Sequence, residues 1–140
     1  MNVAHILTRP MITIGASDTV LTAAKLLVQN NMGLLVVTGA DGKLVGVISE
    51  RDIIRMIASG RTLEIPVNEV CTKNVVTVRG NADVAEAAKA MNKQGIRHVI
   101  VVDDNSKPVG VVSMRDLVGE RATLTAILQS NEKEVFHGAD

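Results

Sequence analysis

Apolar residues in the first half of the chain follow two spacings, and their order predicts an alternation of strands and helices. Apolar runs of strand length lie at residues 11–14, 34–37 and 44–48, and apolar residues at helical spacing lie at 20–28 and 53–57. Turn signals at residues 15–17 and 39–42 separate these runs. We therefore expect the order β-α-β-β-α. Ser17 or Asp18 would cap the first helix, Ser49 would open the second, and residues 34–37 would be buried on both faces.

The second half of the chain shows the same pattern. Strand-like runs lie at residues 75–78, 98–102 and 109–112, with a turn at 103–107. One helix is expected to begin at Asp83 and end at Gly95, and another to begin at Arg115. Residues 123–129 have further helical spacing, and residues 131–140 are polar and expected to fray. The predicted order is again β-α-β-β-α.

The two halves are copies of one repeat. Shifting the sequence by 64 residues, the separation of Asp52 and Asp116, matches residues 3–53 to residues 67–117 without gaps. Identical pairs include Val3/Val67, Thr8/Thr72, Thr13/Thr77, Gly46/Gly110, Ser49/Ser113, Arg51/Arg115 and Asp52/Asp116. Two copies are too few for a solenoid and fit a pair packed about a pseudo-twofold axis. The predicted fold is thus α+β, with repeats at 1–60 and 61–130 and a polar tail at 131–140.

Composition and charge argue against several classes of function. Hydrophobic residues make up 46% of the chain, which is enough for a sizeable core. Fifteen basic and fifteen acidic residues give a net charge of zero. Proteins that bind bulk DNA, RNA or anionic membranes carry an excess of basic residues, so the charge argues against these functions. The only aromatic residue is Phe136, so the stacking platforms of single-stranded nucleic-acid binders are missing.

The sequence also lacks the usual marks of an enzyme or an exported protein. The single cysteine, Cys71, cannot form a disulfide within the chain and is expected to be a small buried apolar side chain before a strand. The three histidines are scattered, and no nucleophile–base pair, metal cluster or P-loop is found. No signal peptide or apolar stretch of roughly 18 to 20 residues occurs. We expect a cytoplasmic protein that is not an enzyme, with no membrane association.

The repeated Ser-x-x-Asp motif has two interpretations. Ser49 and Asp52 have the spacing of a capping box, which by itself would explain the motif in both repeats. The same position, a strand end followed by a helix N-terminus, can also bind anions, and a carboxylate there can accept hydrogen bonds from a vicinal diol. Arg51 and Arg115 fit either a solvated helix start or a phosphate contact. Gly46 and Gly110 would allow a close backbone approach on the preceding strand.

Both repeats resemble CBS domains, and the chain resembles a stand-alone tandem pair, or Bateman module. The resemblance covers residues 3–121 and rests on three features: the repeated Gly-Val-(Ile/Val)-Ser-x-Arg-Asp-(Ile/Leu), the Lys-x-Val-Gly entry into that strand, and the segment at residues 95–103. It implies two clefts between the repeats that bind AMP, ADP or ATP, with S-adenosylmethionine or NAD as alternatives and no catalytic cofactor.

The resemblance also implies which residues meet the ligand. Asp52 and Asp116 would hold ribose hydroxyls, with Ser49 and Ser113 beside the sugar or phosphate. The other implied contacts are Ile12, Thr13, Val76 and Thr77 along the adenine, and Thr8 and Thr72 just before those strands.

The repeats differ where the second has Arg97-His98 and the first has Gly33-Leu34. Members of the family often use a basic pair here for phosphate, so the two clefts are expected to be unequal. His98 could instead be a strand-start histidine satisfied by backbone. If it contacts phosphate, binding should strengthen as the pH falls through about 6.5.

The leading hypothesis is a regulatory, energy-sensing module that binds adenine nucleotides. As in the family, it would form a homodimer through its helices and act on an unidentified regulated protein. The alternative is a protein-interaction or assembly module without a physiological nucleotide. A nucleic-acid partner is not expected, because the net charge is zero and aromatic platforms are missing.

Overall fold

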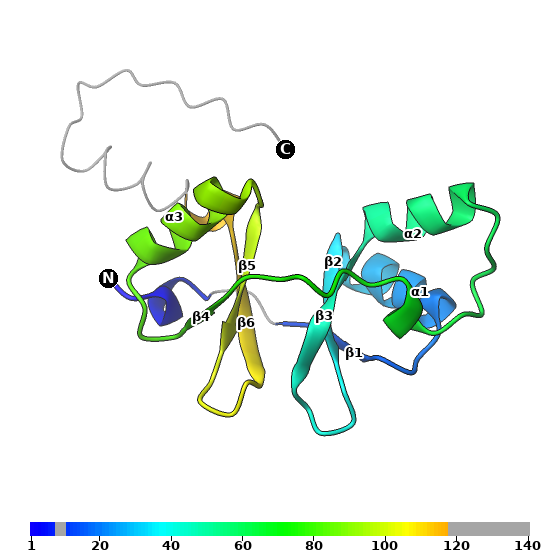
Figure 1. Cartoon of the computed structure of the whole chain (residues 1–140), viewed down its shortest axis with the longest axis horizontal. Coiled ribbons are helices and arrows are strands. Elements are labelled where there is room, and N and C mark those ends of the chain that lie inside the picture. The colour runs from blue at the N-terminus through cyan, green and yellow to red at the C-terminus, as the bar shows by residue number, and fades with distance from the viewer. Residues whose placement is uncertain (8–10, 118–140) are drawn as a thin grey trace, which may run out of the picture. The chain divides into compact units, whose positions relative to one another are not determined.

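The computed structural model describes residues 1–7 and 11–117 of the chain. The first repeat contains β1 (Thr13–Gly15), α1 (Val20–Asn30), β2 (Leu34–Thr38), β3 (Leu44–Ser49) and α2 (Glu50–Ala58) (Figure 1). The second contains β4 (Thr77–Arg79), α3 (Val84–Gln94), β5 (His98–Val102) and β6 (Pro108–Ser113), followed by helical residues 114–117. A short 3₁₀ turn begins each repeat, before its first strand: η1 (Val3–Ile6) in the first and η2 (Val67–Glu69) in the second. The predicted α+β class and the order β-α-β-β-α are confirmed.

The start of the first repeat differs from the prediction in two details. Its first strand begins at Thr13 and not at Met11. The cap of α1 is Thr19, whose hydroxyl accepts from the Thr22 amide at 3.2 Å, so the prediction of Ser17 or Asp18 is wrong. Asp18 is unavailable because its carboxylate closes the preceding turn by accepting from the Gly15 amide at 3.0 Å.

Other boundaries agree more closely with the pattern. Asp83 caps α3 and Gly95 ends it in the left-handed conformation, and β5 spans the predicted residues. The strand predicted at residues 75–78 is found at Thr77–Arg79. The predicted helix at 123–129 and the polar tail at 131–140 lie outside the described residues.

Each repeat builds one three-stranded sheet. In the first, β2 lies in the middle, parallel to β1 and antiparallel to β3, and both helices lie on the same side of the sheet (Figure 1). Residues 35–37 of β2 are all at most 1% exposed, so the predicted burial on both faces is confirmed. The second sheet has the order β4-β5-β6, and Val99, Ile100 and Val101 are buried in the same way.

The segment that begins each repeat packs into the core of the other repeat. Val3 of η1 belongs to the core around α3 and β5, and Val67 of η2 belongs to the core around α1, α2 and β2. The amide of Val3 donates to the Ala82 carbonyl at 2.8 Å, and the amide of Val67 donates to the Asp18 backbone carbonyl at 2.7 Å. Ala82 and Asp18 occupy equivalent positions of the repeat. In the described chain, one compact unit therefore combines residues 1–7, 76–101 and 111–117, and the other combines 11–75 and 102–110.

Within residues 1–7 and 11–117, no helix is long and apolar enough to cross a membrane.

The packing of η1 and η2 into the core of the other repeat leads to a prediction for the stability of two variants. Val67 and Val3 are fully buried, so V67A and V3A should each lower the free energy of unfolding by about 2 kcal/mol through lost burial and a residual cavity. Urea denaturation measures the change. I57A, at a position that is 54% exposed, is the control and should change stability by less than about 0.5 kcal/mol. Equal effects of V67A and I57A would contradict the role of η2 in the core.

Candidate functional site

The repeated motif forms a capping box in both repeats. The Ser49 amide donates to Asp52 Oδ2 at 2.9 Å, and the Asp52 amide donates to Ser49 Oγ at 3.2 Å. Ser113 and Asp116 make the same pair of bonds, at 2.9 and 3.1 Å. The capping interpretation is confirmed. These reciprocal bonds also hold each carboxylate in one orientation at the junction of a strand and a helix.

Asp52 has a second fixed contact, which comes from outside its own repeat. The Thr72 hydroxyl donates to Asp52 Oδ1 at 3.3 Å, while Oδ2 accepts from Ser49. The two oxygens of Asp52 thus have different roles, one in the helix cap and one facing Thr72.

The position of Thr72 depends on a close backbone contact. Its amide and carbonyl pair with Val47 of β3 at 2.8 and 2.9 Å. A Cβ at Gly46 would overlap the Thr72 carbonyl oxygen and the backbone that follows. Glycine at position 46 therefore does allow a close backbone approach, and the approaching backbone is that of Thr72 itself.

The repeated motif opens two helices, α2 and the helical residues 114–117. Some of the amides at their N-termini already donate hydrogen bonds within the chain. The amide of Glu50 donates to the Gly33 carbonyl at 3.0 Å, and that of Met114 donates to the Arg97 carbonyl at 2.7 Å. The serine hydroxyls accept from the amides three residues later, at Asp52 and Asp116. Two of the first three amides of each helix are thus engaged within the chain, which limits what the helix N-terminus can offer to an anion.

The strand residues predicted to line the adenine are placed similarly in both repeats. Ile12 and Val76 are partly buried against their cores, and their carbonyls accept from Val36 and Ile100 at 3.1 and 3.0 Å. Their neighbours Thr13 and Thr77 are exposed.

The predicted site residues fall into two equivalent sets, one in each compact unit. The unit of residues 11–75 contains Ile12, Thr13, Ser49, Arg51, Asp52 and Thr72. The other contains Val76, Thr77, Arg97, His98, Ser113, Arg115 and Asp116. Thr8, the counterpart of Thr72, lies outside the described residues.

The basic pair of the second repeat lies close to Asp116. His98 is accessible at the surface, but partial desolvation of its imidazole lowers its pKa below the ordinary value. The Arg97 guanidinium lowers this pKa further, and the Asp116 carboxylate opposes both effects. Near neutral pH the imidazole is therefore mostly uncharged, and Arg97 supplies the positive charge of this basic pair.

Sequence reasoning missed two basic residues beside Asp52. They line a cavity of about 300 Å³ formed by Asp52, Arg55, Met56, Ser59, Arg61, Glu69 and Val70. Arg55 could have been found, because it follows Asp52 by one helical turn on the same face of α2. Arg61 lies beyond the end of the helix, where periodicity gives no signal.

A second hollow runs between α1 and α2 on the same unit. It encloses about 530 Å³ and is lined mainly by apolar residues: Ala24, Leu27, Val28, Asn31, Met32, Gly33, Glu50, Ile53 and Ile54. Val28 is 81% exposed and Ile54 is 64% exposed. These two helices thus present a largely apolar groove at the surface.

Comparisons with known proteins give matches over most of the chain. The profile of the CBS domain matches residues 3–59 and 67–122. An uncharacterized 17.7 kDa protein of Acidianus ambivalens is 36% identical over 115 residues, which are 82% of this chain and 70% of that protein.

Two solved structures are similar over nearly their whole length. The CBS domain protein PAE2072 from Pyrobaculum aerophilum, complexed with AMP, has a TM-score of 0.81 and 36% identity, and the match covers 91% of this chain and 98% of that one. The CBS domain pair of protein MJ0100, in complex with 5'-methylthioadenosine and S-adenosyl-L-methionine, has a TM-score of 0.80 and 32% identity, and the match covers 89% and 98%.

The lowered pKa of His98 predicts a pH dependence of stability. Its pKa in the folded protein is below the ordinary 6.5, so the unfolded chain takes up the proton first as the pH falls. The contribution of neutral His98 to stability is therefore fully present above about pH 6.5 and is lost as the pH falls toward the folded pKa. As the pH is lowered from about 8 to about 5.5, the free energy of unfolding measured in urea should fall more for the wild type than for H98Q.

H5Q is the control for loss of a histidine elsewhere and should retain the pH dependence of the wild type. If H98Q and the wild type lose stability in parallel, His98 does not carry this effect.

Proposed function

Because the chain belongs to the CBS domain family, we propose that it is a regulatory module that binds an adenine nucleotide and catalyses no reaction. The observation that carries this proposal is the pair of capping boxes, which fix Asp52 and Asp116 at equivalent strand–helix junctions. A carboxylate held in advance loses little freedom when it accepts hydrogen bonds from ribose hydroxyls. Relatives of closely similar fold that bind AMP, or methylthioadenosine and S-adenosylmethionine, support the same ligand class.

The cap and the ribose contact are compatible on the same side chain. In the first repeat, Oδ2 of Asp52 serves the helix cap and Oδ1 faces Thr72. A carboxylate oxygen has two acceptor sites, so Oδ1 can accept from a ribose hydroxyl while Thr72 remains bound. In this proposal Ser49 and Thr72 orient the carboxylate. Ser113 has the same role for Asp116.

The remaining predicted residues divide between base and phosphate. The exposed Thr13 and Thr77, at the starts of β1 and β4, would approach the adenine beside Ile12 and Val76. Arg97 would meet phosphate in the second repeat, with Arg51 and Arg115 as further cationic groups at the helix starts. This charge favours AMP, ADP or ATP over S-adenosylmethionine, whose sulfonium would meet Arg97 at a cost. NAD shares the adenosine phosphate and stays an alternative.

We further propose that the α1–α2 groove is where two copies of the chain meet. An apolar groove with strongly exposed Val28 and Ile54 is unfavourable in water and is suited to a twofold contact, in which the same surface serves both partners. Ligand binding would then alter the surface that a dimer shows to a regulated protein. The alternative, an assembly module with empty sites, shares this groove but gives the repeated carboxylates only a capping role.

The ribose role is tested by D116A. Loss of the cap should lower stability by about 1 kcal/mol, and loss of the carboxylate should in addition weaken AMP binding at this site by about tenfold or more. Calorimetry with AMP measures the affinity. Because the chain has no Trp or Tyr, any nucleotide retained on purification can also be followed by absorbance near 260 nm.

D83A is the matched control, since Asp83 caps α3 through the Ala85 amide at 2.9 Å and is not among the proposed contacts. It should cost similar stability and leave AMP affinity unchanged. If D116A and D83A behave alike, Asp116 has only a capping role.

The dimer is tested by I54E, which places a charge in the groove. It should convert a dimer to a monomer in light scattering coupled to gel filtration. V109E, at an apolar position 48% exposed outside the groove, should leave the dimer intact. A dimeric I54E protein, or a monomeric wild type, would rule out this interface.

A further inference from the structure

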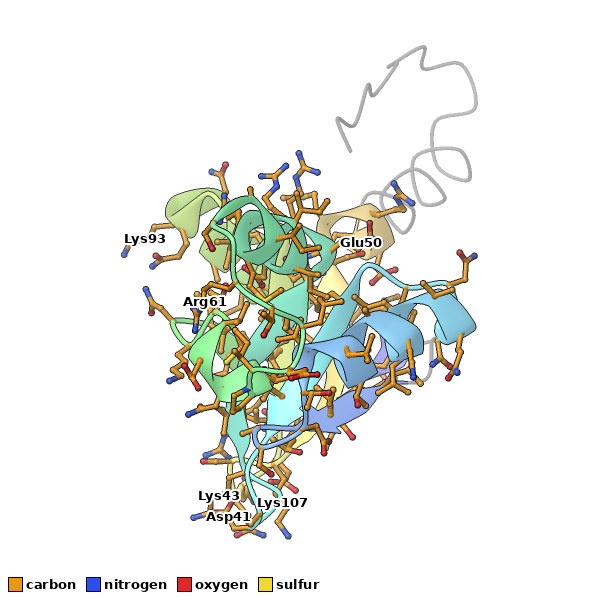
Figure 2. The ribbon with its side chains drawn as sticks, turned by 90° about the vertical axis from the view of Figure 1, so that its right-hand side faces the viewer. Asp41, Lys43, Glu50, Arg61, Lys93 and Lys107 are labelled. Carbon is orange, nitrogen blue, oxygen red and sulfur yellow. The ribbon has the colours of Figure 1, made fainter. Side chains whose placement is uncertain are left out.

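The cavity beside Asp52 contains positive charge that the sequence analysis did not assign to any ligand. It extends from the Asp52 carboxylate along one face of α2, past Arg55, to Arg61 on the loop that follows the helix. Figure 2 shows Arg61 on this loop and Lys43 at the distant tip of the β2–β3 hairpin. All lining residues belong to the compact unit of residues 11–75.

Arg61 forms one exposed ion pair and keeps further N–H donors for other contacts. Its Nη2 donates to Glu69 Oε1 at 3.1 Å, and the two side chains are 43% and 54% exposed. An ion pair this exposed contributes little to stability, so an incoming anion can displace the glutamate at small cost. A guanidinium has five N–H donors, and those that do not meet Glu69 can serve a ligand.

The rest of the cavity suits the end of a ligand that is anchored at Asp52. Met56, on the same face of α2, is buried and provides an apolar floor, and Val70 is partly buried. Arg55 is exposed, one helical turn after Asp52. A ligand with hydroxyls at one end and negative charge at the other therefore finds an acceptor at Asp52 and two guanidinium groups further along.

The sequence shows that this arrangement is specific to the first repeat. The positions 64 residues after Arg55 and Arg61 are Gly119 and Thr125. The basic pair of the second repeat, Arg97-His98, in turn has Gly33-Leu34 as its counterpart in the first. Each motif carboxylate thus has a different set of basic residues, contributed by different elements.

We infer that Arg55 and Arg61 form a phosphate subsite for a nucleotide whose ribose is held by Asp52. The inference rests on the proposed function for the ribose contact and adds the phosphate contacts of the first repeat. On binding, Arg61 exchanges Glu69 for a phosphate oxygen, and Glu69 is the internal competitor of the ligand. Both repeats then select nucleotides over uncharged nucleosides, through guanidinium groups on different elements.

The test compares AMP with adenosine, which lacks the phosphate. Calorimetry is done on the full chain carrying D116A, which weakens the second site so that the Asp52 site dominates the measured binding. R55Q and R61Q should each weaken AMP binding by about tenfold while leaving adenosine affinity unchanged, because each removes charge-assisted hydrogen bonds to phosphate only. E69Q should strengthen AMP binding severalfold, because it removes the competing carboxylate.

K43Q is the matched control for loss of one positive charge in the same unit and should leave both affinities unchanged. If AMP binds and neither arginine variant alters the ratio of AMP to adenosine affinity, the phosphate subsite is wrong and the proposed function stands. The same holds if E69Q weakens AMP binding. If neither AMP nor adenosine binds the wild-type protein, the proposed function and the subsite are both overturned.

Discussion

The docking of η2 onto the first repeat is the contact on which the candidate site depends. Burial of Val67 and its hydrogen bond to Asp18 fix the following residues, so that Thr72 pairs with Val47 and reaches Asp52. The same docking brings Glu69 and Val70 to the face of α2 that carries Arg55. The apolar contact of one small turn therefore decides both the orientation of a carboxylate and the charges around it, since core packing allows few alternative positions.

The proposed function gives each carboxylate of the repeated motif a ligand contact in addition to its structural role in the helix cap. A capping box needs a serine and an acid at fixed spacing, and it positions that acid with hydrogen bonds that are already made in the free protein. The geometry that stabilises the helix is thus the geometry that a hydroxyl-bearing ligand would use. Under the proposed function a substitution of Asp52 or Asp116 would affect both roles, so a cap elsewhere in the chain, such as Asp83, is needed to separate them.

The two repeats keep this motif and differ in the charges that surround it. In the second, Arg97 and His98, whose pKa is lowered, lie near Asp116. In the first, Arg55 and the Arg61–Glu69 pair lie near Asp52. The duplicated scaffold therefore offers two carboxylates in equivalent positions with different electrostatic surroundings, and a module of this kind can bind related ligands at its two sites with different affinities.

The sequence by itself determined the features that depend on neighbouring residues. Periodicity and caps located α3 between Asp83 and Gly95, β5 at residues 98–102, and the capping box at Ser49, because these involve hydrogen bonds and burial patterns within a few residues. Only the tertiary structure decided that Thr72 meets Asp52, that Arg61 shares a cavity with it, and that Val3 and Val67 complete each other's repeats. The sequence shows that Val3 and Val67 are equivalent residues of the two repeats. Which core each one enters depends on packing between residues far apart in the chain, and no local pattern encodes that packing.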